Sequence, residues 1–106
     1  MFQFFINFNH VFLVDAPSSP RDFSGEATCD SVILSWSHPK KDGGFPVINY
    51  VISYGNNTLV IPSNTTDYII DNLEHSTEYS IVIQARTEAA IGDEALVELK
   101  TTQFCE

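Results

Sequence analysis

The sequence predicts an all-β sandwich of seven short strands, and three observations support that prediction. Apolar and polar residues alternate in several short runs, which is the period of strands with one buried face. Gly, Pro, Asn and Asp gather between those runs, as they do in turns. No stretch shows a convincing apolar stripe with the period of a helix. Strands at this spacing are typical of two packed sheets.

The length of the chain, 106 residues, suits one domain and is too short for two. We expect the folded domain at residues 16–103 and a tail at residues 104–106. Residues 1–15 are apolar but interrupted by polar side chains, and we leave them outside the fold. They are interpreted as a truncated end or as a weak signal peptide, because a basic region is missing and Pro17 would follow the cleavage point.

The first two strands are expected at Arg21–Ala27 and at Ser31–Ser37. The second has the clearest alternation, with Val32, Leu34 and Trp36 on one face and serines on the other. The later strands follow the same reasoning, with Ile48, Tyr50, Ile52 and Tyr54 expected to share an inward face. They are predicted at Ile48–Tyr54, Thr58–Ile61, Tyr68–Leu73, Tyr79–Ala85 and around Val97 and Leu99, ending near Thr101.

The charge balance is acidic, with 14 Asp and Glu against 5 Lys and Arg and a net charge of −9. Phosphate backbones and anionic membrane surfaces would be repelled, so no nucleic acid is expected as a partner. The acidity serves solubility, or it favours a basic protein partner. No apolar run is long enough to span a bilayer, so no direct membrane insertion by this domain is expected.

Catalytic and cofactor motifs are missing from the sequence. No phosphate-binding loop, dinucleotide-binding glycine pattern or serine-hydrolase elbow occurs, and no histidine stands in a known motif with a nucleophile. The two cysteines lack the spacing of a zinc site, and no calcium-binding loop is present. We therefore expect a protein that is not an enzyme, with no catalytic residues, no metal and no cofactor.

Four blocks of residues, taken in order, resemble the fibronectin type III family over residues 16–103. Ser31–Trp36 with Pro39 resembles its second strand, and Asp42–Pro46 before Tyr50–Tyr54 resembles its next loop and strand. Leu73, Thr77 and Tyr79 are similar to its corner, and Tyr79–Ala85 with Gly92 to the strand and loop that follow. The blocks are similar to those of receptor tyrosine phosphatases, ephrin-type receptors and titin-like proteins.

The resemblance implies an immunoglobulin-like Greek-key sandwich without a catalytic site. It implies that the hydroxyl of Tyr79 reaches backbone upstream of its own strand, in a tyrosine corner. His75 stands where the family usually has proline in this corner. The side chains expected in the core are Trp36, Tyr50, Ile52, Leu73, Tyr79, Ile81 and Ile83.

The topology implied by the resemblance brings Cys29 and Cys105 to the same end of the sandwich. A disulfide between them is conceivable if their Cα atoms come within bonding range, and it would imply an oxidising compartment. The alternative is two free thiols, with Cys105 in a frayed tail. Asn56 and Asn64 begin two glycosylation sequons in expected loops, although sequons also arise by chance.

The function implied by the family is protein–protein interaction or spacing of domains in the ectodomain of an adhesion protein or receptor. Neighbouring domains of the same type and a protein partner, basic if it meets acidic loops, are the expected contacts. The alternatives are an intracellular structural module of a titin-like protein and an accessory domain of a secreted enzyme. The loop residues expected to meet a partner are Lys40, Lys41, Asp42, Phe45, Glu88, Asp93 and Glu94.

Overall fold

The computed structural model describes residues 2–7 and 10–105, with side chains from Asp15 onward. These residues form nine β-strands, and no helix that could cross a membrane is found among them. Met1, Phe8, Asn9 and Glu106, which belong to the predicted leading segment and tail, lie outside the described residues. The strands are β1 (Phe2–Asn7), β2 (His10–Asp15), β3 (Arg21–Ala27), β4 (Val32–Ser37), β5 (Asn49–Tyr54), β6 (Asn57–Pro62), β7 (Asp67–Ile70), β8 (Glu78–Arg86) and β9 (Ala95–Lys100).

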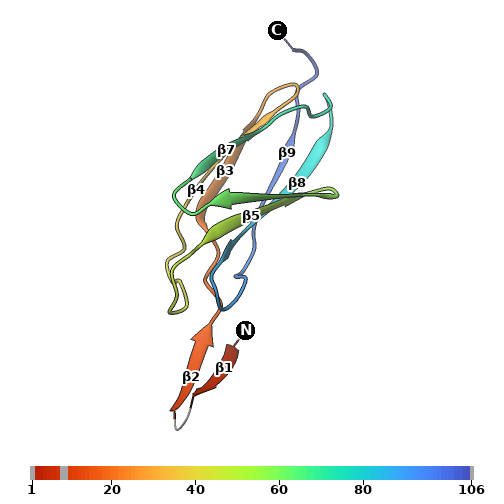
Figure 1. Cartoon of the computed structure of the whole chain (residues 1–106). Coiled ribbons are helices and arrows are strands. Elements are labelled where there is room, and N and C mark those ends of the chain that lie inside the picture. The colour runs from red at the N-terminus through yellow and green to blue at the C-terminus, as the bar shows by residue number, and fades with distance from the viewer. Residues whose placement is uncertain (1, 8–9, 106) are drawn as a thin grey trace.

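Seven of these strands form two antiparallel sheets that pack face to face, as Figure 1 shows. One sheet has the order β3-β4-β7, and the other has the order β6-β5-β8-β9. The chain crosses from one sheet to the other after β4, after β6 and after β7. The crossings give two sheets, and each sheet buries its apolar face against that of the other. The predicted all-β, seven-strand immunoglobulin-like sandwich is confirmed.

The core lies between the sheets and follows the alternation of the strands. In β4, Val32 and Leu34 are fully buried and Trp36 is 4% exposed, while Ile33 between them is 42% exposed. Each buried aliphatic or aromatic side chain stabilises the fold by roughly 1.5–3 kcal/mol relative to exposure. The buried cluster consists of Val32, Leu34, Trp36, Tyr50, Ile52, Ile61, Ile70, Ile81, Ile83 and Ala85.

Two details of the strand prediction are wrong. Ile48, expected on the inward face, is 45% exposed and lies before β5, where its backbone N–H donates to the carbonyl of Arg86. β7 ends at Ile70 rather than at Leu73, because Asn72 adopts a left-handed backbone conformation (φ 58°) that breaks the strand. Leu73 instead belongs to the loop after β7.

Strands β1 and β2 form a hairpin in a segment where the sequence analysis expected no strand. Their register runs from Phe2 opposite Asp15 to Asn7 opposite His10, and they pair with each other but with no described strand of the two sheets. In Figure 1 the hairpin projects from the end of the sandwich opposite the carboxyl terminus. The proposed domain boundaries at residues 15/16 and 103/104 stay a prediction.

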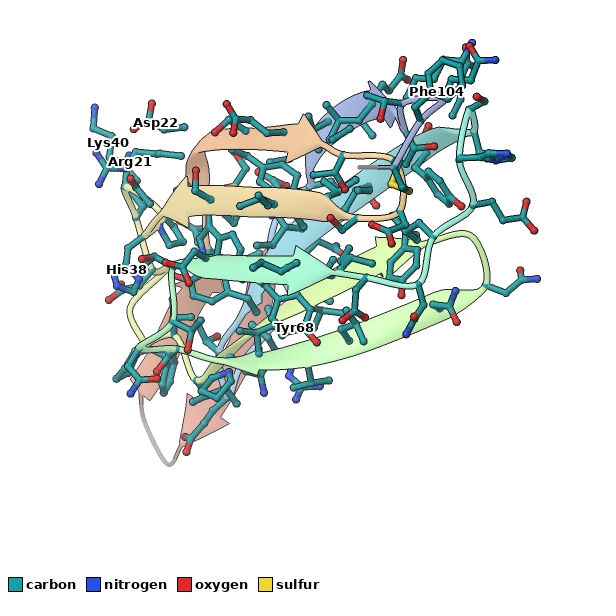
Figure 2. All side chains as sticks on the ribbon, turned by 90° about the horizontal axis from the view of Figure 1, so that it is seen from above. Arg21, Asp22, His38, Lys40, Tyr68 and Phe104 are labelled. Atoms are coloured by element: carbon teal, nitrogen blue, oxygen red, sulfur yellow. A yellow bond between two sulfur atoms is a disulfide. The ribbon has the colours of Figure 1, made fainter. Side chains whose placement is uncertain are left out.

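The sandwich has two ends, an N-terminal pole and a C-terminal pole. The N-terminal pole contains residues 15–18, the β4–β5 loop (residues 38–48) and the β8–β9 loop (residues 87–94). The C-terminal pole contains the β3–β4 loop (residues 28–31), the β7–β8 loop (residues 71–77) and residues 101–105. Figure 2 shows His38 and Lys40 at the first pole and Phe104 at the second.

Candidate functional site

An aromatic layer fills the inner space toward the N-terminal pole. The rings of Trp36 and Tyr50 meet edge to face with centroids 5.5 Å apart, and Phe23 approaches Trp36 in the same manner at 6.5 Å. Such offset contacts are favoured by the charge distribution of the rings. Burial raises the pKa of the Tyr50 phenol, whose hydroxyl shares a hydrogen bond with Nδ1 of His38. The three rings therefore fill the space between the sheets near the N-terminal pole.

The tyrosine corner holds the β7–β8 loop at the C-terminal pole. The backbone N–H of Glu74 donates to the hydroxyl oxygen of Tyr79 over 2.9 Å. The buried Thr101 hydroxyl donates to the carbonyl of Glu74 over 2.6 Å and accepts from the N–H of Thr77 over 2.9 Å. His75, which replaces the proline usual at this corner, is exposed. The loop is therefore tied to strand β8 and to the chain after β9.

A disulfide joins Cys29 and Cys105, whose Cα atoms are 5.1 Å apart across a sequence separation of 76 residues. Cys29 is buried in the β3–β4 loop, where the hydroxyl of Thr28 accepts from the N–H of Ser31 over 3.0 Å and shapes the turn. Thr102 donates to the carbonyl of Thr28 over 2.9 Å, which brings the tail alongside. The tail is thereby linked covalently and by a backbone hydrogen bond to one loop.

At the N-terminal pole, hydrogen bonds to the β4–β5 and β8–β9 loops hold residues 15–18 in place, an arrangement that we call the clasp. Ser18 donates its backbone N–H to the carbonyl of Lys41 over 2.9 Å, and its hydroxyl accepts from the N–H of Lys41 over 3.0 Å. On the other side Asp93 donates to the carbonyl of Pro17 over 3.2 Å. A Cβ at Gly92 would collide with that same carbonyl of Pro17. The backbone segments approach each other more closely than side chains would allow.

Four of the seven predicted partner residues line one hollow of about 620 Å³ at the N-terminal pole. They are Lys40, Lys41, Asp42 and Asp93, and Asp15, Ala16 and Ser18 complete part of its wall. The three others do not line it: Phe45 is half-buried, whereas Glu88 and Glu94 are exposed. The structure thus brings the two predicted loops to one pole. It also places between them a chain segment that the sequence analysis left outside any site.

The role of residues 15–18 was missed by the sequence analysis, although two glycines gave a signal for it. Gly43 has a positive φ of 79°, and a Cβ there would collide with the carbonyl of Asp15. Gly92 makes the matching close approach on the other side. Both glycines were interpreted as turn formers, because a turn and a close backbone approach look alike in sequence.

The other predicted site residues lie in separate places. Asn56 is exposed in the turn between β5 and β6, and Asn64 is exposed in the loop between β6 and β7. Ile52, Ile81 and Ile83 are fully buried. Leu73 and Tyr79 are partly buried and pack against the core cluster.

One group of three ligand-type side chains is close enough to hold a metal among the residues that the structure describes. It consists of Cys29, Asp30 and Cys105. The two sulfurs are bonded to each other in the disulfide, so neither is a thiolate that a metal could bind. The carboxylate of Asp30 alone does not make a metal site.

A seven-strand sandwich with a tyrosine corner and a filled aromatic layer defines an immunoglobulin-like domain. The sequence profile of the Fibronectin type III domain matches residues 18–98. The chain belongs to the fibronectin type III family, as the sequence blocks had predicted.

Relatives of the chain come from several settings. It is 34% identical over 91 residues to "Phosphatidylinositol phosphatase PTPRQ" of Homo sapiens, covering 81% of this chain and 4% of that protein. It is 27% identical over 93 residues to "Titin" of Drosophila melanogaster, covering 80% of this chain and, after rounding, 0% of titin. "Neuronal cell adhesion molecule" of Rattus norvegicus is 31% identical over 97 residues, with coverages of 81% and 8%. The chain therefore spans a small part of each.

A solved structure of titin domains has the same fold. It superposes with a TM-score of 0.70 at 22% identity, and the match covers 92% of this chain and 38% of that one. The chain is thus similar to one module within larger proteins, and the settings of those proteins include receptor-type phosphatases, an adhesion molecule and titin.

Proposed function

We propose that this chain is a non-catalytic interaction or spacer module of a cell-surface or extracellular protein, in a receptor or adhesion ectodomain. The observation that carries the proposal is that the chain is anchored at both poles of a filled sandwich. Residues 15–18 are clasped at one pole, and Cys105 is bonded at the other. A domain held at two opposite ends suits a series of domains, and it leaves its loops free to contact partners.

The extracellular setting is supported by the disulfide and by the exposed sequons. Disulfides persist in oxidising compartments, and exposed Asn56 and Asn64 are accessible to glycan transfer. The test is expression through the secretory pathway, followed by mass measurement before and after treatment with peptide N-glycosidase. We expect a glycan on at least one asparagine and no free thiol in the unreduced protein. Two free thiols per chain together with unmodified asparagines would contradict this setting.

The partner surface that we propose for this function comprises the β4–β5 and β8–β9 loops. Glu88, Asp93 and Glu94 are exposed there and favour a basic partner. Cells or matrix preparations that bind the wild-type chain are identified first. We expect that replacing residues 40–45 and 88–94 by Gly and Ser abolishes this binding. The control variant replaces the exposed Gln103 and Phe104 at the C-terminal pole by Ser, which leaves both sequons and both candidate surfaces unchanged. Undiminished binding by the loop variant would remove these loops from the proposal.

A titin-like intracellular module is the second candidate, and the similarity to titin in sequence and fold favours it. Such a module has no need of a disulfide, because the cytosol is reducing, and it carries no N-glycan, because N-glycans are transferred in the secretory pathway. The thiol and glycan state of the protein isolated from the cells that naturally produce it therefore separates the two candidates. An accessory domain of a larger enzyme is a third setting, and the similarity to a receptor-type phosphatase fits it. It is separated from the first by the sequence that flanks this domain in the full-length transcript.

A further inference from the structure

A lateral groove of about 580 Å³ opens on the side of the sandwich, where β6 of one sheet faces β7 of the other. Figure 2 shows Tyr68 in the space between these two strands. Each strand pairs with only one neighbour, so each leaves one backbone edge beside the groove without a described strand partner. The groove is lined by residues of β6, β7 and the β7–β8 loop, together with Tyr54 of β5 and Tyr79 of β8.

Five aromatic and leucine side chains contribute to the floor of the groove, beside polar residues. Tyr54, Leu59, Tyr68, Leu73 and Tyr79 are all partly buried and pack against the core, which holds them in place. The hydroxyl of Tyr79 accepts from the N–H of Glu74, so the loop that forms one wall is held as well. A floor of ordered rings and leucines offers apolar contact without ordering new side chains, which lowers the entropy cost of binding.

The charge of the groove has one sign. Asp71 and Glu74 are exposed on its rim, and no Lys, Arg or His is among the described residues that line it. The hollow at the N-terminal pole differs, since Lys40 and Lys41 stand there beside Asp15, Asp42 and Asp93. The lateral groove also has the tyrosine faces and leucines that the polar hollow lacks. Carboxylates beside tyrosine rings are complementary to guanidinium groups, which pair with the former and stack on the latter.

We propose that the lateral groove binds an extended, arginine-rich segment of a partner protein that has apolar side chains between its arginines. The apolar side chains contact Leu59, Leu73 and the tyrosines. The arginines pair with Asp71 and Glu74, and the segment runs along the open strand edges. The inference deepens the proposed function, since it needs a binding module. The groove lies on a different face from the β4–β5 and β8–β9 loops. Each proposed binding surface can therefore be disproved without disproving the other.

The test is a titration of the full ¹⁵N-labelled chain, with its disulfide intact and without glycans, monitored by backbone amide shifts. The probes are three synthetic peptides: Ac-RLRVRLR-NH₂, its acidic counterpart Ac-ELEVELE-NH₂, and Ac-RSRSRSR-NH₂, which retains charge without apolar side chains. We expect the first peptide alone to shift the amides of Leu59, Leu73 and Glu74 saturably. An absence of shifts, or shifts confined to residues 38–48 and 87–94, would overturn the proposal.

Charge-matched variants decide whether the groove carboxylates act specifically. Asp71→Asn with Glu74→Gln should weaken binding of Ac-RLRVRLR-NH₂ by about three- to tenfold, as expected for partly exposed ion pairs. Asp42→Asn with Asp93→Asn changes the net charge by the same amount at the N-terminal pole and should leave Kd within about twofold. Equal weakening by the two double variants would show attraction to net charge alone and would refute a site in the groove. If the Asp71→Asn, Glu74→Gln variant still binds a partner through the β4–β5 and β8–β9 loops, the proposed function does not depend on the groove.

Discussion

The two poles of the sandwich hold the chain by different means. At the N-terminal pole, residues 15–18 are clasped by backbone hydrogen bonds from two loops, and Gly43 and Gly92 permit the close approach. At the C-terminal pole, a disulfide links Cys29 to Cys105, and the hydroxyls of Tyr79 and Thr101 hold the adjacent loop. The N-terminal anchor requires glycines, which have no side chain, whereas the C-terminal anchor requires the sulfur and hydroxyl groups of particular side chains.

Different conditions therefore weaken the two ends of the domain. A reducing agent reaches only the C-terminal anchor, because the N-terminal clasp contains no sulfur. Conversely, a methyl group added at Gly43 or Gly92 affects the clasp and leaves the disulfide unchanged.

Removal of the disulfide is expected to have the largest effect. Cys29→Ala with Cys105→Ala opens a loop spanned by a 76-residue separation. The chain-entropy model then predicts a loss of about 4–5 kcal/mol in the free energy of unfolding. Urea denaturation without reductant measures it, and the wild-type chain in excess dithiothreitol is the control. Equal stability of the oxidised and reduced wild-type chains would contradict a stabilising bond.

Gly43→Ala tests the N-terminal clasp. The new methyl group meets the carbonyl of Asp15 at a residue with a positive φ of 79°, so a loss of about 2–4 kcal/mol is expected. Gly44→Ala is the matched control, because its φ of 104° carries similar strain but no atom lies within 4 Å. Its expected loss is about 1 kcal/mol. If both variants lose the same stability in urea, the close contact contributes nothing.

Tyr79→Phe sharpens the description of the C-terminal pole. It removes the acceptor for the N–H of Glu74 while keeping the ring, so a loss of about 1 kcal/mol is expected. Tyr68→Phe is the control, because the Tyr68 hydroxyl has no side-chain hydrogen bond among the described residues. Thermal unfolding of both variants gives the comparison. If Tyr79→Phe and Tyr68→Phe unfold at the same temperature, the Tyr79 hydrogen bond does not stabilise the fold.

Tyr50 is expected to make stability pH-dependent at alkaline pH. Burial raises the pKa of its phenol in the folded state, so the folded state holds this proton more tightly than the unfolded chain does. The stabilisation is complete below the unfolded pKa of about 10 and is lost as the pH rises through the folded pKa. Urea midpoints between pH 8 and pH 11 should therefore fall less steeply in Tyr50→Phe. Parallel profiles would assign the alkaline loss to other groups.

Much of the fold could be predicted from local pattern. The alternation of Val32, Leu34 and Trp36 identified the buried face of β4, because strand side chains point to opposite faces in turn. The same pattern failed at Ile48, which lies outside the strand that it was expected to begin. It failed again after Ile70, where a left-handed Asn72 ends β7. Strand ends depend on single backbone conformations, which apolar patterns do not report.

The candidate sites were less predictable than the core. The two polar loops were expected to meet, and Lys41 and Asp93 do line one hollow. Of residues 15–18, only Asp15 was left outside the fold with the apolar leading stretch, which resembles a truncated or targeting segment. Residues 16–18 were placed inside the domain but were given no role. The lateral groove gave no sequence signal, because Leu59 and Tyr68 look like ordinary core residues of their own strands. A groove arises from strands that lie far apart in the sequence.

The amino-acid sequence alone determined the β class, the buried faces and the family, because alternation and turn residues act over a few neighbouring positions. Only the tertiary structure decided which open strand edges face each other, which glycines allow the two loops to close on residues 15–18, and that Cys29 lies within bonding reach of Cys105. Those outcomes depend on the packing of two sheets, which brings together backbone segments separated by dozens of residues.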